Sequence, residues 1–588
     1  MTLLHEHEWR ALFPLYEPRI EQAEAIDRAI TAIKAGKRFI VLDEPTGIGK
    51  SLIGVTLGLW AEKYMQAPTD KSEVKPGATF ITTQKVLQDQ YMRDFAPQGM
   101  RNLKSASNYD CSFNPNENCK NAWDMMKLNG REEGKRQFNS NWRKACTGAG
   151  CGYRAARMAF MEASLAVTSF AYFLHARSGC PTRQLLVIDE AHNIERQLMS
   201  FVEVRISQRF VEGKLEMKWP IGTDDISSMD DPKAQEARDI LSLWIEDDYM
   251  PKLRAEAQRA REIKMKLDDM IAKGKTNKSA KELIRDADRV IESERQVARF
   301  VENFRRLPDN WVPQVELQWG EKEVNGKTKK YVKGRTIVYK TIDVSPYADS
   351  LLYNKGQVVI CMSATILNGE AYCRSVGIPL DQAEVISHTS PFDIEHRMTL
   401  LWGQGSMSMK EKGTTLPILV AAIGEVLDEH AGEKGIIHTH TYSNAAYLRD
   451  NLGGVHAKRL LFHETDDRDV VLESHTSRDD DDSVLVSPSM AEGVDLKGDL
   501  SKFQIIMKVP YPYLGDPLVK RKMDLNKMWY PYETVKLICQ MLGRSVRSHE
   551  DEAVTYILDS NFAMFYKRNK KMFPEWFREA YKVIRNLR

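Results

Sequence analysis

RFIVLDEPTGIGKS, residues 38–51, joins a short apolar run to a glycine-containing turn and the start of a helix. The apolar run is typical of a buried strand in a parallel sheet. The turn approximates the phosphate-loop pattern G-x-x-x-x-G-K-[ST], with Glu44 in place of the first glycine. This unit predicts an α/β fold with a nucleotide site at the turn. For this stretch alone, a glycine-rich turn that carries a lysine by chance is the alternative.

The residues of the turn have distinct predicted roles in holding a nucleotide. Gly47 and Gly49 let backbone N–H groups curl around phosphate oxygens, and the helix N-terminus adds partial positive charge. Lys50 can reach the β- and γ-phosphates, and Ser51 can ligate Mg²⁺. The predicted ATP-binding residues of this loop are Pro45, Thr46, Gly47, Ile48, Gly49, Lys50 and Ser51.

A second motif, LLVIDEAHNIE at 185–195, ends a buried-strand pattern in two acids. At the carboxyl end of a strand, Asp189 would hold Mg²⁺ together with Ser51. Glu190 would orient and deprotonate the attacking water. Acids that only cap the following helix are the alternative, but the upstream phosphate loop favours the catalytic interpretation.

The C-terminal half repeats the strand-and-turn pattern and adds a helix with spaced polar residues. The segments are VVICMSATIL (358–367), KGIIHTHTYS (434–443), SVLVSPSMAEGVDLKGD (483–499) and QMLGRSVRS (540–548). In the last of these, Arg544 and Arg547 are three residues apart and project from one helix face. Two such arginines can stabilise charge on a transferring γ-phosphoryl group, although a single one is usually a surface charge.

Taken in order, these motifs resemble superfamily 2 helicases, and their spelling resembles the XPD/DinG group of iron–sulfur helicases. The motifs are EPTGIGKS, DEAH, SAT, EGVDL and QMLGRSVR, supported by FITTQKVLQDQ, IDVSPYADSLL, HTSPFD and RSHEDEAVTYILD. The resemblance covers roughly residues 15–200 and 335–575. It implies two RecA-like P-loop motor domains, ATP and Mg²⁺ as cofactors, and an ATP-dependent DNA helicase that moves 5′→3′ on single-stranded DNA and unwinds duplex or forked DNA.

The resemblance also implies roles for individual residues. The residues implied to contact ATP outside the loop are Arg19, Gln22, Glu492 and Asp495. The residues implied in catalysis are Asp189, Glu190, Gln540, Arg544 and Arg547. The residues implied in motor coupling are His192, Ser363, Ala364 and Thr365. Thr83 and Gln84 would contact the DNA backbone, although Gln84 stands where a basic residue or histidine is common in the family.

Four of the eight cysteines are clustered, with the spacing Cys111-x7-Cys119-x26-Cys146-x4-Cys151. Four thiolates suit a [4Fe–4S] cluster, and the family carries an iron–sulfur domain in this interval. A four-cysteine zinc site and unligated core cysteines are the alternatives, and the absence of a C-x2-C pair weakens the zinc interpretation. The remaining cysteines are expected in the core, at Cys180, Cys361, Cys373 and Cys539.

Residues 127–157 are basic, with eight Lys/Arg against two acids and interleaved aromatic residues. Basic side chains can follow phosphates while aromatic rings stack on bases. The predicted DNA-binding residues of this segment are Lys135, Arg136, Trp142, Arg143 and Tyr153. A solvated basic face with ordinary core aromatics is the alternative.

Family sequence is interrupted twice, which predicts a domain order. Motor domain 1 would comprise 1–105, 158–200 and 335–385, with an iron–sulfur domain at 106–157, a mainly helical arch at 201–334 and motor domain 2 at 386–588. Within the arch, charges at helical spacing broken at 272–280 predict two helices, and Asn325-Gly326 predicts a hairpin. Residues 566–588 read as one closing amphipathic helix.

Bulk composition constrains the functional classes. The 588 residues are 42% hydrophobic with a formal net charge of +2, so any nucleic-acid surface must be local. No apolar run is long enough to span a bilayer, and the N-terminus does not resemble a secretory signal. We therefore expect a cytoplasmic protein without membrane contact. We also expect a monomeric motor, R-loops as a further substrate and a protein loading partner. An ATP-driven translocase or remodelling factor without processive unwinding is the alternative function.

Overall fold

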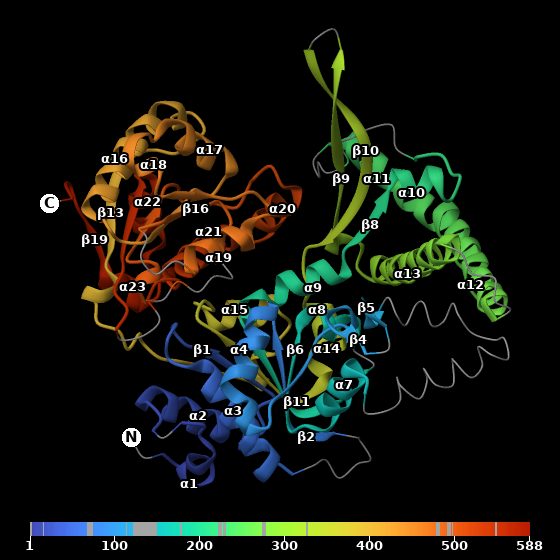
Figure 1. Cartoon of the computed structure of the whole chain (residues 1–588), viewed down its shortest axis with the longest axis horizontal. Helices are drawn as coiled ribbons and strands as arrows, with labels where there is room; N and C mark the ends of the chain where they lie inside the picture. The colour runs from blue at the N-terminus through green and yellow to red at the C-terminus, as the bar shows by residue number, and fades with distance from the viewer. Residues whose placement is uncertain are drawn as a thin grey trace.

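The computed structural model contains two parallel sheets, each the centre of one lobe (Figure 1). It describes residues 3–587 except 16, 67–73, 113, 121–149, 177–178, 221–225, 227–230, 273–277, 325–326, 478–481, 491–495, 497 and 547–549. Within these ranges, every helix is too short or too polar to cross a lipid bilayer.

The sheet of lobe 1 has the order β12-β1-β11-β7-β2-β6-β3, and all of its strands are parallel. Its strands are β1 (Phe39–Asp43), β2 (Lys75–Thr82), β3 (Arg101–Leu103), β6 (Leu165–Ser169), β7 (Arg183–Asp189), β11 (Gly356–Ser363) and β12 (Ala383–Ser387). The helices around it are α1 (Glu6–Trp9), α2 (Ile20–Lys34), α3 (Lys50–Tyr64), α4 (Lys85–Phe95), α8 (Phe170–His175), α9 (Ile194–Val202), α14 (Ser345–Leu351) and α15 (Gly369–Ser375).

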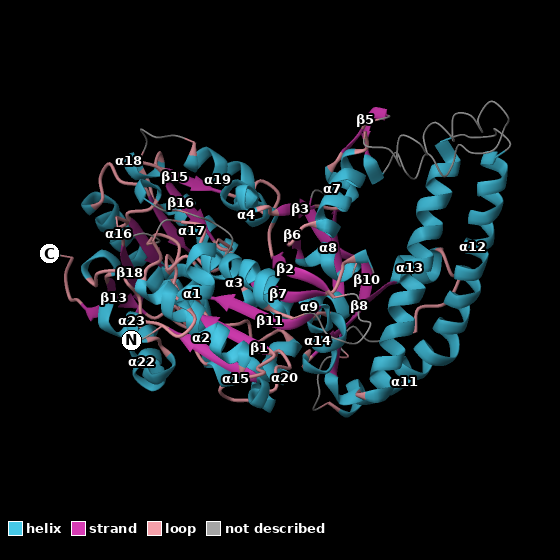
Figure 2. Cartoon of the chain, turned by 90° about the horizontal axis from the view of Figure 1, so that it is seen from below, coloured by secondary structure: helices cyan, strands magenta, loops and turns pink. Residues whose placement is uncertain are grey.

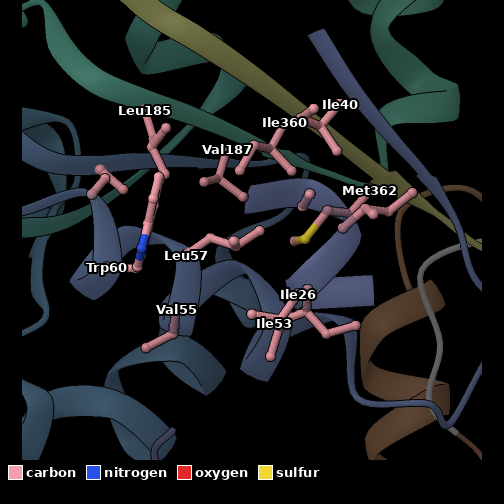
Figure 3. Close-up of a cluster of buried hydrophobic side chains, with 14 of the residues drawn as sticks. Ile26, Ile40, Ile53, Val55, Leu57, Trp60, Leu185, Val187, Ile360 and Met362 are labelled. Carbon is pink, nitrogen blue, oxygen red and sulfur yellow. The ribbon is translucent and has the colours of Figure 1, made fainter. Parts of the chain in front are cut away.

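Helices cover both faces of this sheet, which explains the continuous apolar run of β1. Ile40 and Leu42 pack under α2 and α3, while Phe39 and Val41 belong to the core on the opposite face. Figure 3 shows the first of these cores. Helix α3 can lie close to the sheet because residue 58 is a glycine. A Cβ at Gly58 would lie only 2.8 Å from Leu165 Cδ2. This packing fixes the turn that precedes α3.

Lobe 2 repeats the architecture with the order β15-β16-β14-β17-β18-β13-β19, again all parallel. Its strands are β13 (Thr399–Gly405), β14 (Gly435–His438), β15 (Leu460–Phe462), β16 (Val484–Ser487), β17 (Phe503–Ile506), β18 (Val554–Asp559) and β19 (Tyr581–Val583). Its helices are α16 (Lys412–Glu429), α17 (Tyr442–Asn451), α18 (Gly454–Ala457), α19 (Arg468–Thr476), α20 (Pro517–Leu525), α21 (Trp529–Leu542), α22 (Asn561–Asn569) and α23 (Glu575–Ala580).

One expectation for lobe 2 is wrong, because residues 566–588 do not form a single helix. α22 ends at Asn569, Pro574 precedes the short α23, and β19 then pairs with β13. Pro574 has no backbone N–H to continue a helix. The pairing of β19 adds the last strand to the sheet.

The first insertion follows β3 and contains a two-stranded hairpin and a helix. These are β4 (Asp110–Cys111), β5 (Asn114–Asn118) and α7 (Gly152–Glu162). The second insertion comprises β8 (Val204–Ser207), α10 (Gln208–Gly213), α11 (Pro232–Leu243), a π-helical turn (Trp244–Tyr249), α12 (Met250–Ala272), α13 (Lys278–Arg306), β9 (Trp311–Val324) and β10 (Lys327–Thr341).

The predicted arch helices are confirmed: α12 and α13 run side by side, far from lobe 2 (Figure 2). The predicted hairpin is also confirmed, because β9 and β10 pair antiparallel up to Val324 opposite Lys327. Its turn residues lie outside the described ranges. Residue 334, the predicted end of the arch, lies inside β10. The strand continues to Thr341, where its pairing with β9 ends. The predicted fold class, two RecA-like domains with two insertions, is confirmed.

Candidate nucleotide site between the lobes

The phosphate loop connects β1 to α3, as the sequence predicts, and its glycines adopt positive φ. Gly47 has φ +80° and Gly49 has φ +86°, backbone angles that residues with a Cβ rarely adopt. A Cβ on Gly49 would also lie 2.5 Å from Gln22 Nε2. The loop therefore needs glycine at Gly49 both for its backbone conformation and for space.

Arg19 and Gln22, predicted as adenine contacts, lie against this loop. Arg19 Nη1 donates to the carbonyl of Gly47 at 2.6 Å, and Gln22 Nε2 donates to the carbonyl of Ile48 at 2.7 Å. Gln22 Oε1 in turn accepts from the Arg19 backbone N–H at 2.8 Å. The two side chains brace the loop, and their predicted contact with adenine stays a prediction.

Lys50 and the acids of the second motif approach the same loop from two sides. Lys50 Nζ donates to the backbone carbonyls of Glu44 at 3.0 Å and Pro45 at 3.2 Å. Burial raises the pKa of Asp189 to about 6, with repulsion from Glu190 acting in the same direction and attraction to Lys50 opposing both. A group of opposed charges is therefore held in a low-dielectric site at the carboxyl ends of β1 and β7.

Tyr91, on α4, is a site residue that the sequence analysis missed. Its hydroxyl donates to Asp189 Oδ2 at 3.1 Å and lies close to the Ser51 side chain. One hydroxyl thus lies beside both side chains predicted to ligate Mg²⁺, so their placement fits that ion. The available signal was its position directly after FITTQKVLQDQ, but an aromatic residue on a helix gives no sign of what its hydroxyl contacts.

The predicted coupling residues form a connected set behind the acids. His192 Nδ1 lies 2.8 Å from Ser363 Oγ and 3.3 Å from Glu190 Oε2. Ser363 Oγ also accepts from the Thr365 backbone N–H at 3.1 Å. Glu190 itself has φ +52°, an uncommon value for glutamate that directs its side chain beside His192. Side chains from two strands, β7 and β11, are therefore joined at their carboxyl ends.

Lobe 2 presents the end of α21 to the phosphate loop. A Cβ on Gly543 would lie 3.1 Å from Thr46 Cγ2, and Thr46 Oγ1 donates to the carbonyl of Val546 at 3.4 Å. Pro45, Thr46 and Ala364 of lobe 1 line a cavity between the lobes together with Gln504, Leu542 and Gly543 of lobe 2. Predicted residues of lobe 1 therefore face the C-terminal end of α21 across one cavity.

Two of the predicted lobe 2 residues can be placed in detail. Gln540 is 2% exposed, and neither its amide oxygen nor its amide nitrogen has a hydrogen-bond partner within the described residues. Arg544 is 8% exposed, and its Nε donates to the carbonyl of Gln540 at 3.2 Å. An unsatisfied buried amide is costly in isolation, so Gln540 fits a polar ligand in the cleft. Arg547, Glu492 and Asp495 lie outside the described residues.

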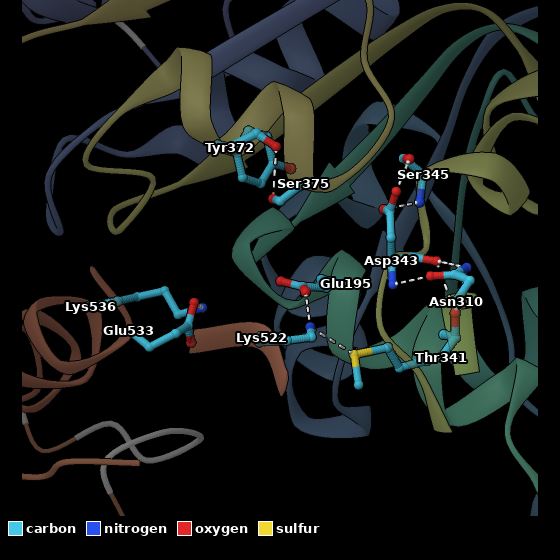
Figure 4. A network of polar contacts seen from close by, with 11 residues as sticks. Glu195, Asn310, Thr341, Asp343, Ser345, Tyr372, Ser375, Lys522, Glu533 and Lys536 are labelled. Atoms are coloured by element: carbon cyan, nitrogen blue, oxygen red, sulfur yellow. Dashed lines mark hydrogen bonds and ion pairs between the residues drawn. The ribbon is translucent and has the colours of Figure 1, made fainter. Parts of the chain in front are cut away.

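A second contact between the lobes joins α9 to α20 (Figure 4). Lys522 Nζ pairs with the Glu195 carboxylate, lies 3.5 Å from Met199 Sδ and sits over the Trp529 ring at 5.5 Å. Lys522 is 7% exposed, so the pair is largely desolvated. Since Glu195 follows the acidic motif by one helical turn, lobe 2 contacts lobe 1 close to the nucleotide site.

Tyr109 connects the segments that carry three of the clustered cysteines. Cys111 follows Tyr109 by two residues, and the Cys119 backbone N–H donates to the Tyr109 carbonyl at 2.7 Å. Cys151 directly precedes α7, where Tyr153 packs edge-on against Tyr109 with ring centroids 5.5 Å apart. The three segments lie near one another, and no group of three or more metal-ligating side chains forms among the described residues. Cys146 lies outside them.

The other four cysteines are buried, which confirms the prediction that they belong to the core. Burial raises the pKa of Cys180 and Cys373 to about 11 and that of Cys361 to about 12. Burial likewise raises the pKa of Cys539. These thiols are therefore protonated and unreactive at neutral pH.

The predicted DNA-contact residues are placed only in part. Thr83 and Gln84 directly follow β2 at the carboxyl edge of the lobe 1 sheet, and the Gln84 carbonyl accepts from Thr82 Oγ1 at 3.1 Å. The Tyr153 hydroxyl lies 3.2 Å from that of Tyr172, so this ring serves packing as well. Lys135, Arg136, Trp142 and Arg143 lie outside the described residues.

Comparison with known proteins points in one direction. The family description "Type III restriction enzyme, res subunit" matches residues 15–212, and "Helicase C-terminal domain" matches residues 425–580. ATP-dependent DNA helicase DinG of Photobacterium profundum is 27% identical over 237 residues, which is 37% of this chain and 34% of the relative. ATP-dependent DNA helicase YoaA of Escherichia coli is 25% identical over 247 residues, 39% of this chain and 37% of the relative.

Solved structures agree with the sequence matches. An XPD helicase structure superposes with a TM-score of 0.59 at 15% identity, over 97% of this chain and all of the other. S. tokodaii Xpd4 gives a TM-score of 0.55 at 15% identity, over 96% of this chain and all of the other. Parts of the chain are therefore similar in sequence to ATP-dependent DNA helicases, and its fold is similar to that of the XPD structures. The chain spans about a third of the length of the two bacterial relatives that it matches.

Both insertions lie within lobe 1. The hairpin with α7 interrupts lobe 1 between β3 and β6, and the arch interrupts it between α9 and α14. Both leave the central strands of the sheet intact. The insertions therefore add surfaces to lobe 1 without interrupting the strands that carry the candidate nucleotide site.

Proposed function

We propose that the protein is an ATP-dependent DNA helicase whose ATP site lies between the two lobes. The observation that carries this proposal is the approach of α21 to the phosphate loop, where Gly543 and Thr46 are in contact and Gln540 has an unsatisfied amide. A nucleotide held by lobe 1 would be within reach of side chains of lobe 2. ATP binding and hydrolysis would then change the relation between the lobes.

The chemistry follows from the arrangement in lobe 1. Lys50 would exchange its two carbonyl contacts for the β- and γ-phosphates. Ser51 and Asp189 are the residues that would hold Mg²⁺, which supplies charge neutralisation on the phosphates. Glu190 would accept the proton of the attacking water. Gln540, Arg544 and Arg547 would contact the γ-phosphoryl group from lobe 2, and Arg544 could stabilise the charge that develops on it.

The hydrogen bonds between His192, Ser363 and Thr365 support a role in coupling. Glu190, the proposed base for the attacking water, contacts His192 through its carboxylate. A change in charge at Glu190 therefore reaches β11 through two hydrogen bonds. This connection would communicate hydrolysis to the segment of lobe 1 that faces lobe 2.

The proposed substrates are single-stranded and forked DNA. The protein would act as a monomeric motor that moves along the single strand in the 5′→3′ direction. The family resemblance supports the polarity, and the position of Thr83 and Gln84 at a sheet edge supports a strand crossing lobe 1 there. R-loops and a loading partner extend the same proposal. Movement without strand separation is the competing outcome.

We further propose that Cys111, Cys119, Cys146 and Cys151 hold a [4Fe–4S] cluster. Tyr109 connects the segments of three of these cysteines, which supports a shared ligand, and the cluster would stabilise an insertion too small for a large core of its own. An anaerobic absorption spectrum with iron, sulfide and zinc assays tests this. A colourless protein that contains zinc would overturn the cluster and leave the motor proposal intact.

DNA-stimulated ATP hydrolysis and unwinding of a forked duplex by the purified protein test the main proposal. Lys50→Ala should abolish both activities while DNA binding remains, because the lysine serves the phosphates. Lys63→Ala is the matched control, since Lys63 is an exposed lysine at the other end of the same helix. DNA-stimulated hydrolysis that survives Lys50→Ala would contradict the assigned site. Hydrolysis without unwinding would favour a translocase.

A further inference from the structure

Glu44 replaces the first glycine of the phosphate-loop pattern, and its side chain has no part in the proposed chemistry. That side chain is nevertheless completely buried. Its Oε1 lies 2.8 Å from His388 Nδ1, and its Oε2 has no hydrogen-bond partner within the described residues. A buried carboxylate without a partner is costly, so the hydrogen bond from His388 is what compensates Glu44 in this position.

The backbone of Glu44 is held by two further groups. Its N–H donates to the carbonyl of Ser363 at 2.9 Å, and its carbonyl accepts from Lys50 Nζ at 3.0 Å. Ser363 belongs to the proposed coupling set, and Lys50 is the proposed phosphate ligand. If Lys50 turns to the phosphates, Glu44 loses that contact and keeps those to Ser363 and His388.

His388 is the first residue of the segment that connects the two lobes. β12 ends at Ser387 and β13 begins at Thr399, and we call residues 388–398 the connector. His388 Nε2 lies 3.4 Å from Glu24 Oε2 on α2, so both ring nitrogens face a carboxylate of lobe 1. The His388 side chain is only 12% exposed. The lobe 1 end of the connector is therefore fixed at the phosphate loop.

The other part of the connector is fixed to lobe 2. Phe392 is buried against Val546 and Ala553, and the Ala553 N–H donates to the His396 carbonyl at 3.0 Å. The Val546 carbonyl in turn accepts from Thr46 Oγ1 of the phosphate loop at 3.4 Å. Lobe 2 thus reaches the phosphate loop twice, once directly and once through the connector.

We propose that His388 is a positioning residue through which lobe 2 sets the conformation of the phosphate loop, with Glu44 as its contact in the loop. The proposal rests on the proposed helicase function, because it assumes that ATP occupies this loop. When Lys50 moves to the phosphates, the hydrogen bond from His388 keeps Glu44 in place. A movement of lobe 2 that displaces the connector would loosen the loop and weaken its hold on the nucleotide.

The test is the affinity of the whole chain for a non-hydrolysable ATP analogue with Mg²⁺, measured without DNA. His388→Ala should raise the dissociation constant roughly tenfold, because a buried carboxylate loses its partner. His388→Asn should restore most of the affinity, since its amide nitrogen can take the place of the histidine Nδ1. His396→Ala is the matched control and should bind as the wild type does, because residue 396 contacts lobe 2 through its backbone carbonyl.

Glu44→Gln/His388→Ala separates the position of the loop from its charge. This variant lacks the hydrogen bond between the two side chains but leaves no buried charge unpaired, so it should fold even if His388→Ala does not. The loss of affinity should persist in it. Restored affinity would overturn the proposal, since the loss would then come from an unpaired negative charge near the phosphates.

Equal affinities of His388→Ala and the wild type would also overturn the proposal, and a lower thermal midpoint in that variant would then mark His388 as structural only. The same measurement separates this proposal from the proposed function. If the wild type binds the analogue and His388→Ala binds it equally well, only the role of His388 is wrong. If the wild type does not bind the analogue, the nucleotide site is contradicted and the positioning role falls with it.

Discussion

The hydroxyl of Tyr532 on α21 donates a hydrogen bond to the backbone carbonyl of Ile366 in lobe 1. The N–H of the same Ile366 donates to Asp43 Oδ1 at 3.1 Å, at the start of the phosphate loop. One peptide segment thus connects the loop to the helix that carries Gln540. Thr365, the residue before it, belongs to the proposed coupling set.

Tyr532→Phe should weaken this connection without opening the interface, because the ring remains. One lost hydrogen bond costs about 1 kcal/mol, so we expect a fall of about fivefold in DNA-stimulated kcat with a smaller change in the KM for ATP. Tyr530→Phe is the control, since its hydroxyl donates to Pro512 within lobe 2 at 3.1 Å. Equal effects of the two variants would argue against a coupling role for Tyr532.

Gly49→Ala should weaken nucleotide binding. The added Cβ meets Gln22 Nε2 at 2.5 Å, and φ is +86°. We expect the dissociation constant of a non-hydrolysable ATP analogue to rise more than tenfold, equivalent to about 1.4 kcal/mol or more. Gly36→Ala has the same φ of +86° but nothing within 4 Å, so it tests backbone strain alone. Normal affinity in Gly49→Ala would show that the loop does not hold the phosphates as proposed.

The hydrogen-bonded pair of His388 and Glu44 should make the free energy of unfolding fall as pH rises. His388 Nδ1 lies 2.8 Å from Glu44 Oε1, and this hydrogen bond to the carboxylate raises the pKa of His388 above its ordinary value, while burial raises the pKa of Glu44. A raised histidine pKa gives stability that is complete below the unfolded-state value and is lost as pH rises through the folded-state value. Above that pH, Glu44 would remain as a buried carboxylate beside a neutral ring.

The measurement is the thermal midpoint of wild type and His388→Gln at about pH 6 and about pH 8.5, on either side of the histidine titration. The wild type should be the more stable protein at the lower pH, and the difference should shrink at the higher pH. His396→Gln, which changes a histidine elsewhere in the connection to lobe 2, serves as the control. A constant difference between the two pH values would mean that the charge on His388 contributes nothing to stability.

Cys111→Ser should remove iron from the purified protein, because a [4Fe–4S] cluster needs all of its thiolate ligands in place. Iron and sulfide per chain, with the absorption near roughly 400 nm, give the readout. Cys373→Ala changes a buried core cysteine and should keep the iron content of the wild type. Equal iron in the two variants would exclude Cys111 as a ligand.

Local patterns were sufficient to predict several elements of the fold and site. The strand, turn and helix around Gly49 follow from an apolar run, glycines and a helix start that are contiguous in sequence. The two arch helices follow from a break in helical spacing. The closing strand β19 was missed, since three residues become a strand only because β13 offers them an edge.

The sequence by itself determined the nucleotide loop, the acidic motif and their order, because those features depend on residues that are neighbours in the chain. Tertiary structure alone decided that Tyr91 donates to Asp189, and that Tyr532 reaches Ile366. Such contacts join residues far apart in the chain, and no local periodicity records them.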